Sequence, residues 1–164
     1  MSHKSNHTSE VLPELPEMEG YRIVIVNTAW NRKITEKLEV AAIKTLLKAK
    51  VLKNDISVVT VPGAFELVFA AKRVIKALDP HAVICLGCII KGETPHDIYL
   101  SEAVSQGIMQ LNIDKGVPVI FGVLTTNNMD QAMDRAGGEH GNKGAEAALA
   151  ALHIYASNAF KLIA

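Results

Sequence analysis

The sequence predicts an α/β fold, a flavodoxin-like three-layer sandwich in which helices cover both faces of a four-stranded parallel sheet. Four short apolar runs of strand length recur along the 164 residues, and a segment typical of a helix follows each of them. Strands that alternate with helices pair in parallel through right-handed crossovers, which places helices on both faces of the sheet. The nearly continuous apolarity of residues 82–90 indicates a central strand that is covered on both sides.

The first half of the chain supplies two strands and two helices. The β-branched run 21–27 (YRIVIVN) predicts the first strand, and an apolar stripe along residues 34–50 predicts the helix that follows. Residues 56–61 are typical of the second strand. Pro62-Gly63 ends this strand, and we expect the next helix to continue to about residue 78.

The third strand, residues 82–90, leads through a short polar loop into a helix start. Thr94, Pro95 and Asp97 provide a hydroxyl for the N-cap, a proline at the first helical position and an acid at the third. Free N–H groups and the positive end of the helix dipole then lie at the carboxyl edge of the sheet, where α/β folds bind anions. His96, in the first turn, can carry a proton near neutral pH. A plain exposed residue without a chemical role explains this position equally well.

The rest of the chain predicts a fourth strand and two helices. Residues 118–125 (PVIFGVLT) are typical of a strand, and Asn127 with Asp130 resembles a capping pair at the start of a short helix. Arg135 lies in the last turn of that helix, where its guanidinium either complements the helix dipole or offers a planar fork to a phosphate. An alanine-rich helix is expected from about residue 142 to about residue 162.

Composition argues against several classes of function. Apolar residues make up 49% of the chain, and 17 basic residues balance 17 acidic ones, so neither a nucleic-acid partner nor a polybasic membrane partner is indicated. No uninterrupted apolar stretch reaches about eighteen residues and the polar N-terminus does not resemble a signal peptide, so we expect a cytoplasmic protein. Residues 1–20 lack a helical or strand period and predict an arm, either flexible or docked against a neighbouring subunit, ahead of a single domain over residues 21–164.

The two cysteines, Cys85 and Cys88, form a CxxC motif. Residues three apart in a strand point to opposite faces, so the two thiols should diverge. No second CxxC or histidine pair completes a zinc site. We therefore expect both cysteines to be small buried residues, and we expect no metal site.

Two other side chains follow strands at the edge where ligands bind. Trp30, the only tryptophan, is expected in the loop after the first strand, where it can stack on a flat ligand or simply pack against the loop. Glu66, in the first turn of the second helix, either favours the helix dipole or accepts hydrogen bonds from ligand hydroxyls. The chain has no GxGxxG after a strand and no GxxxxGK[ST], so neither dinucleotide nor P-loop chemistry is indicated.

Five segments lie at expected strand ends or in expected ligand loops: TAWN (28–31), VPGAFEL (61–67), GCIIKGETPH (87–96), PVIFGVLTT (118–126) and DRAGGEHGNKG (134–144). Together, and in this order, they resemble the lumazine synthase family over about residues 21–154. The resemblance implies a condensation, without a cofactor, of 5-amino-6-(D-ribitylamino)uracil with 3,4-dihydroxy-2-butanone 4-phosphate. An imine forms between the amine and the ketone, phosphate leaves, and ring closure with loss of water gives 6,7-dimethyl-8-ribityllumazine.

The resemblance also implies a role for each matching residue. His96 would transfer protons and Trp30 would stack on the pyrimidine ring. The phosphate would be bound at the helix start by Glu93 and Thr94, and also by Arg135, close to His96. The other expected contacts are Ala64, Phe65 and Glu66 with the ribityl chain, Cys88, Ile89 and Ile90 with the uracil, and Phe121 with the site of the adjacent subunit.

Family members form pentamers with sites between subunits, and some assemble twelve pentamers into a hollow shell. The short loop 137–141 carries no insertion of the kind that blocks shell packing, so the resemblance permits a pentamer or a 60-subunit shell. Riboflavin synthase is a further candidate partner. Departures from the family pattern include Lys91 in place of arginine, and Glu93 and Glu139 reduce the positive charge near the phosphate. We therefore expect backbone N–H groups to dominate phosphate binding.

Other functions compatible with this fold explain fewer of these residues. A non-catalytic carrier of flavin or lumazine would keep Trp30 without needing a proton carrier or a phosphate-binding arginine. A purely structural shell protein would need neither His96 nor Arg135. A phosphoacceptor receiver would need acids clustered at strand ends, whereas the first strand ends in Asn27-Thr28.

Overall fold

The computed structural model describes residues 20–157, so most of the arm expected over residues 1–20 lies outside the described part of the chain. The elements follow in the order β1 (Ile23–Thr28), α1 (Arg32–Lys48), the 3-10 turn η1 (Lys53–Asp55), β2 (Ile56–Val61), α2 (Glu66–Leu78), β3 (Ala82–Ile90), α3 (His96–Lys115), β4 (Val119–Thr126), α4 (Met129–Asp134), β5 (Ala136–Gly138), β6 (Gly141–Asn142) and α5 (Lys143–Ala156).

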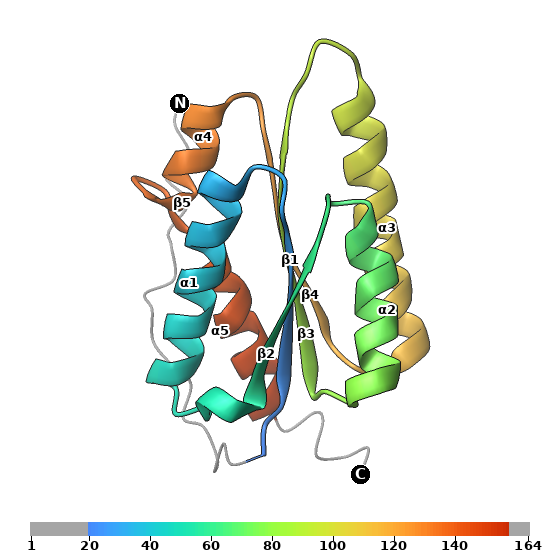
Figure 1. The fold of residues 1–164 in the computed structure, drawn as a ribbon, viewed down its shortest axis with the longest axis vertical. Helices are drawn as coiled ribbons and strands as arrows, with labels where there is room; N and C mark the ends of the chain where they lie inside the picture. The colour runs from blue at the N-terminus through green and yellow to red at the C-terminus, as the bar shows by residue number, and fades with distance from the viewer. Residues whose placement is uncertain (1–19, 158–164) are drawn as a thin grey trace.

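The central sheet has the strand order β2-β1-β3-β4, and each neighbouring pair is parallel. Ile23 pairs with Ala82 and Asn27 with Leu86, so β1 and β3 run side by side in the middle. All four strands therefore end at the same edge, the upper edge in Figure 1. This arrangement confirms the predicted four-stranded parallel α/β fold.

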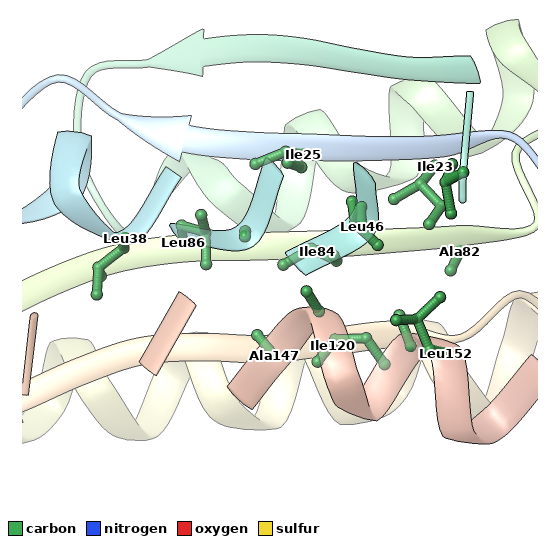
Figure 2. Close-up of a cluster of buried hydrophobic side chains, with 14 of the residues drawn as sticks. Ile23, Ile25, Leu38, Leu46, Ala82, Ile84, Leu86, Ile120, Ala147 and Leu152 are labelled. Atoms are coloured by element: carbon green, nitrogen blue, oxygen red, sulfur yellow. The ribbon is translucent and has the colours of Figure 1, made fainter. Parts of the chain in front are cut away.

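Helices cover both faces of this sheet (Figure 1). Ile23 and Ile25 of β1 face a core formed with α1 and α5, part of which is drawn in Figure 2. Val24 and Val26 face the other core, formed with α2 and α3. Alternation along each strand thus supplies both layers, as expected for strands buried on two sides.

The cysteines divide between these cores, as predicted. Cys85 belongs to the α2–α3 layer and Cys88 to the α1–α5 layer. Burial raises the pKa of the Cys85 thiol to about 12 and that of the Cys88 thiol to about 11. Both side chains are therefore neutral, packed residues at neutral pH and not thiolate nucleophiles.

The helix starts differ from the prediction in which residue caps them. Thr94 does not cap α3: the helix begins at His96, Pro95 holds the N-cap position, and no side chain caps it. The carbonyl of Pro95 accepts the N–H groups of Ile98 at 3.1 Å and Tyr99 at 3.4 Å, so the chain turns one residue later than expected.

The capping pair predicted at Asn127 and Asp130 is also wrong. Asn128 caps α4, because its side chain accepts the N–H of Gln131 at 2.9 Å. The backbone of Asn128 is extended, as an N-cap requires.

The C-terminal part contains a feature that was not predicted. Strands β5 and β6 form a small antiparallel hairpin between α4 and α5. The final helix, expected to reach about residue 162, ends at Ala156, because Ser157 is extended. None of the helices within residues 20–157 combines the length and the apolarity needed to cross a membrane.

Candidate active site

A cleft of about 270 Å³ opens at the carboxyl edge of the sheet, between the loop after β1 and the start of α3. It brings together residues from three segments that are far apart in the sequence, 28–31, 64 and 88–100. Among the predicted site residues, those that line it are Trp30, Ala64, Cys88, Ile89, Ile90, Thr94 and His96.

Trp30 forms one wall of this cleft and is 66% exposed. The loop that carries it is bonded to the loop after β2, because the N–H of Ala29 donates to Val61 O at 2.8 Å and that of Trp30 to Pro62 O at 3.0 Å. The indole lies against Gly63, where a methyl group on the α-carbon would come within 2.5 Å of Trp30 Cε3. One side of the ring is thus supported by backbone, which leaves the rest available to a flat ligand.

Glu66 and Phe65 do not line the cleft, although their neighbour Ala64 does. Glu66 Oε2 accepts the N–H of Gly63 at 2.9 Å and so satisfies a free donor at the start of α2. Phe65 is largely exposed to solvent.

The opposite wall comes from β3 and the start of α3. Cys88 and Ile89 are buried, and Ile90 is half-buried at the strand end. His96 is the first residue of α3 and is exposed at the cleft surface, near Thr94. Glu93 lies in the intervening loop, exposed and outside the lining.

Five lining residues were not predicted as site residues: Thr28, Asn31, Gly92, Asp97 and Leu100. Asn31 has a left-handed backbone, with φ of 56°, and its Nδ2 donates to Cys88 O at 2.8 Å, which ties the Trp30 loop to β3. An asparagine in the turn between a strand and a helix could have suggested this, because asparagine tolerates that conformation. Asp97 is half-buried, and its Oδ1 is buried without a hydrogen-bond partner among the described residues.

Arg135 lies in a different cleft, of about 430 Å³, between the end of β4, α4 and the start of α5. Its Nη1 donates to His140 O at 2.6 Å and its Nη2 to Glu146 Oε2 at 3.1 Å. Lys143 Nζ approaches the same carboxylate at 3.4 Å. Within one protomer, therefore, Arg135 does not share a cleft with Thr94 and His96.

Phe121 is also separate from the cleft that contains His96. It lies on β4, where it pairs with Cys85, and it is 37% exposed. It lines neither of the two clefts. Of the predicted site residues, one protomer thus leaves Phe65, Glu66, Glu93, Phe121 and Arg135 outside the cleft that contains His96.

Comparison with known proteins gives a consistent picture. The family model described as 6,7-dimethyl-8-ribityllumazine synthase matches residues 20–158. The chain is 53% identical over 133 residues to the 6,7-dimethyl-8-ribityllumazine synthase of Porphyromonas gingivalis. The aligned residues make up 81% of this chain and 83% of that protein. It is 46% identical over 156 residues to the protein of that name from Cytophaga hutchinsonii, with 95% and 98% covered. It is 42% identical over 161 residues to the chloroplastic 6,7-dimethyl-8-ribityllumazine synthase of Spinacia oleracea, with 93% and 72% covered.

Proposed function

Because the chain belongs to the 6,7-dimethyl-8-ribityllumazine synthase family, we infer that its active site is the cleft lined by Trp30 and His96. The enzyme condenses 5-amino-6-(D-ribitylamino)uracil with 3,4-dihydroxy-2-butanone 4-phosphate to 6,7-dimethyl-8-ribityllumazine and releases phosphate and water. The observation that carries our assignment of the site is that residues matched to the family from three distant segments line this single cleft.

In the proposed site the uracil lies against Trp30 and along the end of β3. The exposed indole supplies a stacking surface, and Cys88, Ile89 and Ile90 supply an apolar wall that excludes water. The phosphate of the second substrate binds at the start of α3, where free N–H groups and the helix dipole favour an anion. His96, in the same turn, then lies close to the reacting carbonyl and the leaving phosphate.

The reaction requires only proton transfer and the correct placement of the two substrates. His96 transfers protons as the imine forms and as phosphate leaves. Holding an amine and a ketone in reactive contact converts a bimolecular step into an effectively unimolecular one, which accounts for most of the rate. The neutral, buried thiol of Cys88 serves as a wall and not as a nucleophile.

We further propose that the site is completed between subunits of a homo-oligomer, a pentamer that can assemble further into a 60-subunit shell. Proteins of this family are typically oligomeric. Arg135 and Phe121 lie outside the cleft of their own protomer, and in the oligomer each would extend into the cleft of the adjacent subunit. Arg135, which is 27% exposed and held by Glu146, would then bind the phosphate from the opposite side.

We place the enzyme in the cytoplasm, in keeping with two free, buried cysteines. We also propose that riboflavin synthase receives the product as a partner, which co-sedimentation of the two purified proteins tests: independent migration of both would contradict it.

Subunit complementation tests the shared site. Purified His96→Ala and Arg135→Ala variants are unfolded, mixed in equal amounts and refolded together, and product formation is followed by lumazine absorbance and fluorescence. If each site takes His96 from one subunit and Arg135 from its neighbour, about a quarter of the sites regain both residues and activity returns. Each variant refolded alone is the control. No recovery in the mixture, with oligomers confirmed by mass, would place both residues in one protomer's site.

A further inference from the structure

A buried polar cluster lies behind the loop that carries Trp30. It consists of Asn27, Thr28 and Thr35, whose exposed fractions are 0%, 1% and 0%. Asn27 and Thr28 end β1, and Thr35 lies in the first turns of α1. Buried polar groups are costly unless their hydrogen bonds are made, so the partners of this cluster indicate what it holds in place.

Asn27 uses both ends of its side-chain amide. Its Oδ1 accepts the N–H of Thr28 at 2.9 Å, and its Nδ2 donates to Thr35 O at 3.3 Å and to Glu39 Oε2 at 2.6 Å. The end of β1 is thereby joined to α1 on the far side of the Trp30 loop. The carboxylate makes the Glu39 bond a charge-assisted one, which is stronger than a neutral bond.

Thr35 closes the same loop from the helix side. Its Oγ1 donates to Thr28 O at 2.8 Å, and its N–H donates to Asn31 O at 3.1 Å. Both ends of the four-residue turn that contains Trp30 are therefore bonded to Thr35. The middle of the turn is held by the backbone bonds to the loop after β2 that are described above.

The Trp30 indole itself is exposed, and it lies against Gly63. The position of the ring against Gly63 therefore depends on how the loop that carries Trp30 is held. An apolar pair in place of Asn27 and Thr35 could fill the same space, but it would not select one loop conformation, since dispersion contacts have little directionality. Satisfied hydrogen-bond networks do have that effect.

We propose that Asn27 and Thr35 are positioning residues that fix Trp30 as the stacking surface for the pyrimidine of 5-amino-6-(D-ribitylamino)uracil. This inference rests on the proposed stacking role of Trp30. The two residues do not touch the substrate; they act through the loop. They therefore govern affinity for the uracil substrate and not for the butanone phosphate, which binds at the start of α3.

The test compares Thr35→Val, which removes the hydroxyl at constant shape, with Thr35→Ser, which restores it. Thr45→Val, nearer the other end of α1, is the matched control because Thr45 lies away from the cleft. Because Trp30 is the only tryptophan, its fluorescence anisotropy decay reports the loop in the free enzyme. We expect Thr35→Val to enlarge the fast-rotating component, and Thr35→Ser and Thr45→Val to leave it near the unaltered value.

Steady-state kinetics supply the second measurement. Thr35→Val should raise KM for the uracil substrate about fivefold, the loss expected for one ordinary hydrogen bond, with KM for the butanone phosphate and kcat nearly unchanged. An unaltered anisotropy decay, or an equal rise of both KM values, would overturn the proposal. If Thr35→Val does not fold, Glu39→Ala replaces it, because the half-buried Glu39 accepts a hydrogen bond from Asn27. We expect Glu39→Ala to enlarge the fast-rotating component and to raise KM for the uracil substrate, each by less than Thr35→Val.

Trp30→Ala separates this inference from the proposed function. If it leaves KM for the uracil substrate unchanged, Trp30 is not a stacking surface and the proposal fails with it, whatever the anisotropy shows. If Trp30→Ala raises that KM but Thr35→Val changes neither measurement, the stacking role stands and the positioning role is overturned.

Discussion

His96 is the side chain on which the proposed chemistry depends most. It lies in the first turn of α3, exposed at the cleft surface, so its replacement should not disturb the core. We expect His96→Ala to lower kcat about a hundredfold, a usual size for general acid–base catalysis, with little change in either KM. Activity should remain measurable, because substrate proximity supplies most of the rate.

His153→Ala on α5 is the matched control for this substitution, since His153 is also exposed and does not line the cleft. Steady-state kinetics with both substrates distinguish a role of His96 in proton transfer from a role in substrate binding. A loss of substrate binding with unchanged kcat would mean that His96 holds the ligand and does not transfer protons.

His81 gives the stability of the protein a dependence on pH. Desolvation lowers the pKa of His81 and the Arg22 guanidinium lowers it further, while the carboxylates of Asp79 and Asp55 oppose both. Its Nδ1 accepts the N–H of Arg22 at 3.1 Å, a bond that the imidazolium cannot make.

The direction of this pH dependence follows from the lowered pKa of His81 in the folded protein. Between that pKa and about 6.5, the ordinary value, the unfolded chain binds more protons. The free energy of unfolding should therefore be fully maintained above pH 6.5 and should fall as the pH drops below it. Urea unfolding measured at several pH values should show this fall, and His81→Gln should reduce it. An identical fall in both proteins would exclude His81 as its source.

At the scale of elements, the close approach of α1 and α5 is the most demanding contact. A methyl group on Gly144 would collide with the backbone oxygen of Leu38, so Gly144→Ala would force two backbones apart. We expect it to lower the free energy of unfolding by about 3 kcal/mol or more, measured by urea unfolding. Gly107→Ala on α3 is the comparison, because its methyl meets only the side chain of Val68 at 2.8 Å. Equal losses would mean that separating α1 from α5 costs no more than moving the Val68 side chain.

The elements that could be predicted are those with a local signal in the sequence. Apolar runs located the four parallel strands. The prediction that Cys85 and Cys88 face opposite sides of the sheet was correct because it depends on strand geometry alone. The β5–β6 hairpin carries no apolar alternation, and its turn depends on Gly137 and Gly141 with positive φ. The prediction that Thr94 caps α3 was wrong by one residue, because the backbone conformation of a single residue decides where a helix begins.

The site could be predicted only where one segment carries the information. Trp30 and His96 each follow a strand, so parallel-sheet topology brings them to one edge. The environment of Arg135 could not be predicted in this way. Its partner Glu146 is eleven residues further along the chain, on the next long helix, and its separation from His96 appears only in three dimensions.

At the scale of the whole molecule, the layer formed by α2 and α3 exposes large apolar side chains. Phe69 on α2 and Ile113 on α3 are 69% and 70% exposed, and Met109 is 61% exposed. Exposed apolar surface of this kind is typical of a contact between subunits. In the proposed oligomer this layer packs against neighbouring subunits, and the shared active sites depend on that packing.

This dependence predicts that activity can be lost through a residue far from the cleft. Ile113 lies near the end of α3 opposite His96, so Ile113→Asp should dissociate the oligomer through burial of an unpaired charge, and activity should fall with it. Sedimentation mass and turnover are measured on the same samples, with Val40→Asp on α1 as the control on the other helix layer. We expect the control to keep the mass of at least a pentamer. Full activity in a monomeric Ile113→Asp protein would show that one subunit alone contains everything the reaction needs.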